Sequence, residues 1–361
     1  MDPTPGLTNI SASLNGTLAW AGCVVESPEY ITNGLVTFHF SSSSHSTSAT
    51  YNVGSTQTYA QVSNVQLNAA TTYTVYASCS ATNGTAVTSS STSLTTAAAS
   101  STAKPSESWL ELPAADTKLY PNAQELKVKS GGERNYTAYY DKSTFTSMWT
   151  AYPLQSKHMG SLSRPSKWYF NTEIGEEYQV DLTDSSYEGD VYSRGHLIPN
   201  ASRNGISEMQ KQTFYVTNSV PQVQNSFNSG IWSSLEGALQ TMAKGGETLY
   251  IVTGVAFSKV GESKSVSYIK AKDDTKNIPI PNYFYKIVLK VTTNSSGTVT
   301  SASTIGFWFE NKAYSNSTYA NCAVSVDQVE QWTGFDFFAN LPDGIEASAE
   351  SNTNWSSFQS F

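Results

Sequence analysis

The stretch Ser193-Arg194-Gly195-His196 decides how this sequence is interpreted. Arginine is rare in the 361 residues, and all four arginines fall between residues 134 and 203. A guanidinium group is a planar fork of donors that suits phosphate, and an imidazole titrates close to neutral pH, where it can take a proton from water. The stretch therefore predicts an anion site with a candidate general base.

A second polar segment runs from Asn218-Ser219-Val220-Pro221-Gln222 through to Glu236. From about Ser229 its pattern is helical, so side chains four residues apart are expected on one face. The residues at this spacing are Asn228, Trp232, Glu236 and Gln240. An asparagine oxygen is a hard neutral ligand, and a hydrated Mg²⁺ needs few protein ligands. The segment therefore predicts a magnesium site at Asn228, with Glu236 further along the same face.

Together the two segments resemble the DNA/RNA non-specific endonucleases, the sugar-nonspecific nucleases of the ββα-metal group. The family signature is Asp-Arg-Gly-His followed by Asn…Pro-Gln…Asn…Trp…Leu-Glu. The resemblance covers about Ser106 to Phe361, and it includes the stretches 148–152, 280–286, 333–338 and 341–343. It implies an α+β nuclease domain with a central antiparallel sheet. The implied activity is hydrolysis of phosphodiester bonds in DNA and RNA, with Mg²⁺ or Mn²⁺ as cofactor and contacts mainly to phosphate.

The resemblance also implies a role for each matching residue. His196 would be the general base and Asn228 the metal ligand, although an asparagine also suits a helix N-cap. Glu236 would hold metal-bound waters, against the alternative of a solvated helix face. Arg194 would contact phosphate or only support its loop. Asn218 would shape the site.

Two positions depart from the family pattern. Ser193 stands where the family has an aspartate, which puts an orienting carboxylate in doubt. Gln240 stands where the family often has an arginine, and Arg164 or Arg203 could supply the missing contact. An alternative therefore stays open: the chain is a catalytically weak or inactive surface binding protein that keeps the nuclease fold.

The sequence predicts a multi-domain chain. Residues 1–96 alternate in short apolar segments separated by turns such as Asn33-Gly34, which is typical of an all-β sandwich. The segment 67–77 resembles the corner between two strands of fibronectin type III domains, with Tyr73 as the corner tyrosine and Trp20 as a core tryptophan. Residues 97–105 form a small, polar linker, and 106–361 form the nuclease domain. The strands expected in the first domain are 7–14, 17–25, 35–40, 47–53, 56–62, 72–79 and 86–94.

In the second domain the pattern predicts six strands and three helices. The expected strands are 136–140, 148–152, 248–255, 283–291 and 301–308, with a further short one at 214–217. The expected helices are 207–213, 231–243 and one that begins after Ser325 as N-cap. His158 has no motif around it comparable to that of His196, so it is expected at the surface. The tail after Gly344 shows no strong pattern.

Charge and cysteine content limit the partners and the compartment. The net charge of −8 argues against a surface coated in positive potential, so attraction for nucleic acid must come from a small basic cleft and the metal. The sequence contains no run of about 20 apolar residues, the length needed to span a membrane. Cys23 and Cys79 could pair, but free thiols are an equal alternative, and Cys322 has no partner in its domain. No signal peptide follows Met1, yet the Ser/Thr-rich first hundred residues favour an exported, periplasmic or cell-surface protein.

Overall fold

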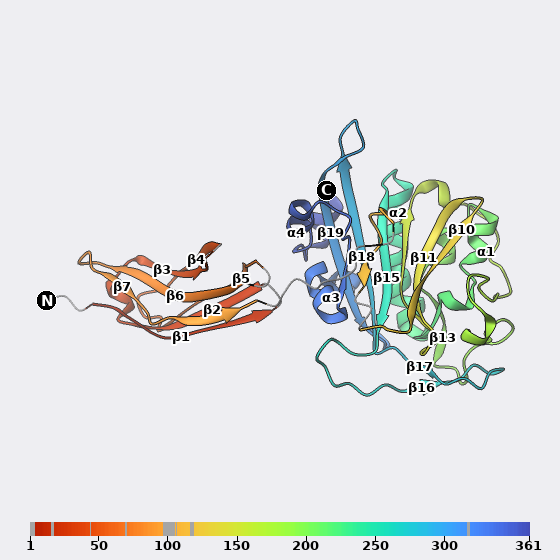
Figure 1. The fold of residues 1–361 in the computed structure, drawn as a ribbon, viewed down its shortest axis with the longest axis horizontal. Helices are drawn as coiled ribbons and strands as arrows, with labels where there is room; N and C mark the ends of the chain where they lie inside the picture. Colours follow the sequence, from red (N-terminus) through yellow and green to blue (C-terminus); the bar gives the residue numbers. More distant parts are fainter. Residues whose placement is uncertain are drawn as a thin grey trace. The chain divides into compact units, whose positions relative to one another are not determined.

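The computed structural model describes residues 4–15, 18–43, 45–68, 71–96, 105, 107–115, 119–315 and 318–361. The chain divides into two compact units, residues 1–101 and 102–361 (Figure 1). The division falls within the expected linker, of which residues 97–104 lie outside the described part.

The first unit is rich in strands, which form two antiparallel sheets. Their orders are β1-β2-β5 and β4-β3-β6-β7, and β8 also pairs with β6. The strands are β1 (Gly6–Asn15), β2 (Leu18–Glu26), β3 (Ile31–Ser41), β4 (Ser46–Asn52), β5 (Tyr59–Gln66), β6 (Thr72–Ala81), β7 (Ala86–Thr88) and β8 (Thr92–Thr95). Side chains from both sheets share one buried core. The resemblance of this unit to fibronectin type III domains stays a prediction.

Two aromatic residues of this unit have different outcomes. The hydroxyl of Tyr73 accepts a hydrogen bond from the backbone N–H of Asn68 at 3.0 Å, so it holds the turn as expected. Trp20 is only half-buried and lies outside the core, so its expected core position is wrong. Ala19 and Ala21 on either side of it are buried, so strand alternation places the Trp20 side chain on the face away from the core. All three cysteines are free thiols.

The second unit is built on a central sheet in which every neighbouring pair is antiparallel. The order is β10 (Ala123–Ser130), β11 (Glu133–Asp141), β12 (Thr146–Leu154), β15 (Leu249–Ala256), β18 (Tyr283–Thr293), β19 (Val299–Glu310) and β20 (Ala323–Val324). Every residue of β12 is buried, because the sheet is covered on both faces and its middle strands need no polar side. The expected central antiparallel sheet is confirmed.

Helices and irregular segments cover both faces of this sheet. On one face α2 (Ser233–Lys244) packs Leu235 and Leu239 into a core that includes Phe284. On the other face α3 (Val326–Thr333) packs Val326 and Val329 into a separate core. Figure 1 shows α3 and α4 (Asp343–Ala349) beside β19. The face covered by α2 carries the predicted site residues.

The remaining elements are short. They are β9 (Ala114–Ala115), β13 (Tyr192–His196), α1 (Ser207–Gln212), β14 (Ser219–Val223), β16 (Tyr268–Ile269), β17 (Ile278–Pro279), β21 (Phe335–Asp336) and α5 (Trp355–Ser360). Short 3-10 turns occupy 28–30, 156–158, 176–178, 200–202, 216–218 and 319–322.

Three local predictions for the second unit differ from the structure, and in the first unit the single strand expected at 86–94 is two strands, β7 and β8. The expected strand at 214–217 is wrong, because residues 216–218 form a 3-10 turn and the strand is β14, five residues later. The helix expected from Ile231 begins at Ser233, after a wide, irregular helical segment over 224–232. The patternless tail contains α4 and α5. The third expected helix is confirmed, since the hydroxyl of Ser325 accepts a bond from the N–H of Gln328 at 3.1 Å.

Candidate functional site

A two-stranded ribbon, β13 with β14, carries His196 at its end. Gly195 is required here, since a Cβ at this position would lie 2.4 Å from Oε1 and 2.6 Å from Cβ of Gln222 on the facing strand. Asn218 is fully buried. Its Oδ1 accepts from the N–H of Ile198 at 3.0 Å, and its Nδ2 donates to the carbonyls of Ile198 and Thr213. Asn218 thus fastens the chain just past His196 and does not line the pocket.

Four of the five predicted site residues meet in one pocket of about 450 Å³. They are Arg194, His196, Asn228 and Glu236. The first two come from β13, and the last two come from the segment that leads into α2 and from α2 itself. Side chains more than thirty positions apart in the sequence therefore share one cavity.

His196 is held between aromatic rings. Its ring centroid lies 4.5 Å from that of Trp168 and 4.9 Å from that of Phe214. Burial, followed by the positive charge of Arg164, lowers the pKa of His196 to about 3, although a hydrogen bond with the backbone of Arg194 acts in the opposite direction. The imidazole is therefore neutral at pH 7. Its Nε2 is buried and has no partner among the described residues.

The amide of Asn228 is oriented by two acceptors. Its Nδ2 donates to Oγ of Ser193 at 2.9 Å and to Oε1 of Gln224 at 3.0 Å. The Ser193 hydroxyl in turn donates to the carbonyl of Gln222, so it can only accept from the amide. Both amide hydrogens are used, and Oδ1 is the atom left for a ligand. Ser193 thus does the orienting work that the missing aspartate put in doubt.

The backbone around Asn228 is irregular. Ser226 has φ 63°, and Gly230 lies outside helical geometry with φ −124° and ψ −110°. The helical pattern expected from about Ser229 therefore becomes regular only at Ser233, although Asn228 and Glu236 do face the same pocket. Trp232 is fully buried in the core, as expected.

Glu236 interacts electrostatically with a buried lysine. Lys286 on β18 is fully buried, its Nζ donates to Oγ1 of Thr253 at 2.6 Å, and it lies 4.6 Å from the centre of the Trp232 ring. Burial raises the pKa of Glu236 to about 7, and Lys286 opposes that rise. Burial likewise lowers the pKa of Lys286 to about 8. The charge of Lys286 therefore favours the ionised form of Glu236.

The arginines near the pocket divide into three kinds. Arg194 uses Nη1 to donate to the carbonyls of Leu182 and Ser185, so it supports that loop while lining the pocket. Arg203 is fully buried and donates to Asn135 and to the carbonyl of Pro153, so the idea that it supplies a phosphate contact is wrong. Arg164 lines the pocket, and its guanidinium has no hydrogen bond to a described residue.

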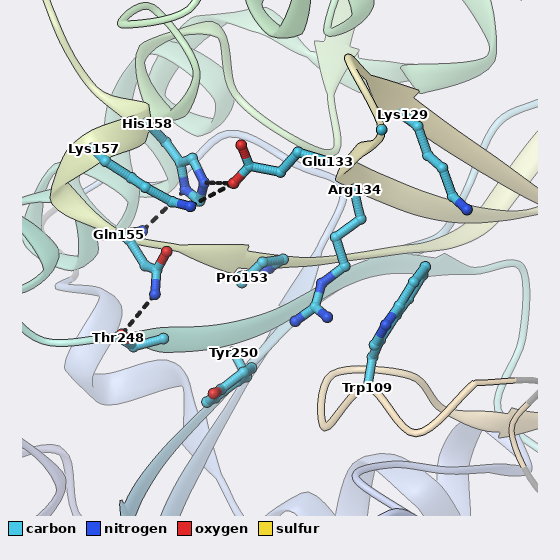
Figure 2. Close-up of a pocket in the computed structure, with 11 residues that line it drawn as sticks. Trp109, Lys129, Glu133, Arg134, Pro153, Gln155, Lys157, His158, Thr248 and Tyr250 are labelled. Atoms are coloured by element: carbon cyan, nitrogen blue, oxygen red, sulfur yellow. Dashed lines mark hydrogen bonds and ion pairs between the residues drawn. The ribbon is translucent and has the colours of Figure 1, made fainter. Parts of the chain in front are cut away.

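A second pocket, of about 400 Å³, contains none of the predicted site residues (Figure 2). His158 lines it and is 1% exposed, so its expected surface position is wrong: its Nδ1 accepts from the N–H of Gln155. Two of the cations here are paired, since Lys157 faces Glu133 and Arg134 bonds Glu111, while the ammonium of Lys129 lies 5.9 Å from the centre of the Trp109 ring. This pocket therefore has cations but none of the residues that the motif predicts for the site.

The comparison with protein families decides what the chain is. The model described as DNA/RNA non-specific endonuclease matches residues 120–344, which include the whole pocket. The chain belongs to this family. No helix in the described part of this endonuclease-family chain is long and apolar enough to cross a membrane.

Several proteins named as nucleases are similar to this family member. A nuclease of Nostoc sp. is 30% identical over 244 residues, which cover 67% of this chain and 82% of the relative. Mitochondrial nuclease 1 of Schizosaccharomyces pombe is 26% identical, with 58% and 66% covered, and bovine mitochondrial endonuclease G is 25% identical, with 47% and 55% covered. This chain thus matches less than two thirds of the last two.

A solved structure supports the fold of the endonuclease domain. The crystal structure of the EndoG/EndoGI complex matches with a TM-score of 0.51 and 19% identity, over 63% of this chain and 93% of that chain. At this identity the likeness shows the fold alone.

Sequence reasoning missed several residues that build the pocket. Trp168 comes from a polar connection whose course no periodic pattern fixed, and Gln224 precedes the helical pattern. Lys286 does not line the pocket but acts on Glu236 through its charge, and it was missed because a lysine inside an apolar strand does not reveal what it faces. Only the hydrogen bonds and ring contacts above identify these residues.

Proposed function

We propose that this chain is a metal-dependent, non-specific endonuclease that hydrolyses phosphodiester bonds in DNA and RNA. The observation that carries the proposal is that Nε2 of His196 and Oδ1 of Asn228, neither bonded to a described residue, belong to side chains that line one pocket. Membership of the family and the names of the relatives support it. The proposed metal is Mg²⁺, with Mn²⁺ as a substitute.

The donor set fits such a metal. An amide oxygen and a carboxylate are hard oxygen donors, as Mg²⁺ prefers, and few protein ligands are needed because the ion keeps several waters. Oδ1 of Asn228 would hold the ion, and Glu236 would bond its waters. When bound, the ion supplies stabilisation of charge on the phosphate and on the leaving oxygen.

The chain's own residues supply the other parts of the reaction. His196, neutral at pH 7, takes the proton of the attacking water through Nε2. The rings of Trp168 and Phe214 keep the imidazole in place. Arg164 binds phosphate, and Arg194 does so only with the nitrogens that it does not use for its loop. Contacts to phosphate carry no base information, so little sequence preference is expected.

The test is digestion of supercoiled plasmid and of RNA by the full chain, with MgCl₂ and with EDTA. We expect cleavage of both substrates with the metal and none with EDTA. Cleavage should return when MgCl₂ is added in excess. If the purified chain binds nucleic acid but leaves it intact under every metal condition, the chain is instead an inactive surface binding protein that keeps the nuclease fold.

Arg164 should matter mainly for binding. We expect Arg164→Ala to raise KM by about tenfold, because a charge-assisted contact with phosphate contributes about 1.5 kcal/mol or more. Steady-state cleavage of a fluorescent duplex measures this. Lys167→Ala, which removes a nearby exposed cation outside the pocket, is the matched control and should change KM little. Equal effects of the two changes would assign Arg164 to general attraction rather than to the site.

Lys286 should set the pH at which activity appears. An ionised Glu236 accepts hydrogen bonds from metal-bound waters more strongly than a protonated one, so activity should rise as the pH passes through about 7. In Lys286→Met the opposing positive charge is gone, the pKa of Glu236 rises further, and the acid limb should move up by about one unit or more. Burial lowers the pKa of His196 to about 3, well below this limb, so we assign the limb to Glu236.

The control for this shift lies on the same strand. Lys290 is also buried in β18, but it pairs with Glu247 away from the pocket. Lys290→Met should therefore leave the limb in place. An unmoved limb in Lys286→Met, measured with folding checked by circular dichroism, would show that Lys286 does not act on Glu236.

A further inference from the structure

A group of carboxylates lies away from the pocket, where α3 meets the end of α4. Asp327 and Glu330 are three residues apart on α3 and so share a helix face, and Glu350 follows directly after α4. One carboxylate oxygen from each of the three lies within 4.8 Å of the others. The backbone brings them together, since the carbonyl of Glu350 accepts from the N–H of Val326 at 2.9 Å.

Glu350 is the most deeply buried carboxylate of this group. It is only 4% exposed, and its Oε1 is buried without a partner among the described residues. Glu330, by comparison, uses Oε1 to accept from the N–H of Phe337 at 2.7 Å. A buried carboxylate oxygen with no donor costs free energy unless a proton or a cation compensates it.

The neighbouring charges increase that cost. Burial and then four other carboxyl groups raise the pKa of Glu350; these are Glu330, Glu346, Asp327 and Asp336. These four neighbouring groups are all acidic, so each of them disfavours a negative charge on Glu350. The ion pairs found in the described part of the chain place no lysine or arginine on the three carboxylates.

We propose that Asp327, Glu330 and Glu350 form a second cation site that takes Ca²⁺ and fastens the C-terminal segment to α3. Ca²⁺ accepts carboxylates from separate elements in flexible geometry and completes its shell with water and carbonyl oxygens. The site is distinct from the pocket of His196, because α3 packs on the opposite face of the sheet from α2. Its function is structural, so its presence does not depend on nuclease activity.

The test uses the full chain, freed of metal, and CaCl₂ as the only added divalent cation. With free Ca²⁺ about 100-fold above its Kd, we expect a rise in Tm of about 5 °C or more. Asn228→Ala removes the other metal ligand and should keep this rise. Glu350→Gln, and separately Asp327→Asn on the less buried side, should abolish it. Glu208→Gln, an exposed change on α1, should keep it.

Calorimetric titration supplies the second measurement. Ca²⁺ should bind Asn228→Ala, and the heat of this binding should be lost when Glu350→Gln is added to that variant. The proposal is overturned if Ca²⁺ leaves the Tm of the native chain unchanged, or if Glu350→Gln responds to Ca²⁺ like the native chain. Shared protons, and not a cation, would then compensate the buried carboxylates.

Discussion

Replacement of His196 by alanine should lower kcat by about 10²- to 10⁴-fold while the chain stays folded and still binds its metal. The reason is that Nε2 of His196 has no partner among the described residues in the pocket and is the proposed acceptor of the proton from water. Single-turnover cleavage of a duplex at saturating MgCl₂ measures the loss. Added imidazole should restore part of the rate in His196→Ala, because the cavity between Trp168 and Phe214 can accept the free base.

The chain offers its own control for this change. His39 lies in the first unit, where Nε2 is within 2.8 Å of Oγ of Ser78, and His39→Ala should retain full activity. His158 is a poorer control, because it is buried and its Nδ1 accepts a hydrogen bond from the N–H of Gln155, so its removal would disturb the fold. If His196→Ala keeps most of the native rate, another group activates the water and the proposed mechanism is wrong.

Much of the fold could be predicted because its signals are local. The strands around Trp149, Ile251 and Ile287 are largely apolar runs of strand length, as expected of buried strands. Strand β10 was missed, because an edge strand with a half-exposed, lysine-bearing sequence resembles a loop. The helices of the tail were missed for a similar reason, since their few apolar residues, such as Trp355 and Phe358, act only through tertiary contacts.

The site was predictable as a set of residue types but not as a set of contacts. The motif and its spacing identified His196, Asn228 and Glu236, which do share a pocket. Spacing could not reveal that Asn228 lies in an irregular segment, because a regular helix would also place Asn228 and Glu236 on the same side. It also could not show that Arg203 is buried, since burial of an arginine depends on carbonyls such as that of Pro153, fifty residues away.

Removal of the Asn228 amide should weaken Mg²⁺ binding by about 100-fold or more, since even the partners that orient a metal ligand contribute 10- to about 100-fold. Asn228→Ala loses the amide oxygen, Oδ1, which has no hydrogen bond to a described residue. The dependence of cleavage rate on MgCl₂ concentration measures this. In Asn228→Ala the required concentration should rise far more than the maximal rate falls.

Ser193 provides the sharper part of this prediction, because it tests orientation separately from ligation. Ser193→Ala keeps the ligand oxygen but removes an acceptor of the Asn228 amide, so the Mg²⁺ requirement should rise by about tenfold. Ser193→Asp restores an acceptor at the family's usual position and should return the requirement to the native value or below it. Ser234→Ala, an exposed change outside the pocket, should have no effect. If Ser193→Ala matches the native chain while Asn228→Ala does not, Gln224 alone orients the amide, because its Oε1 is the remaining acceptor.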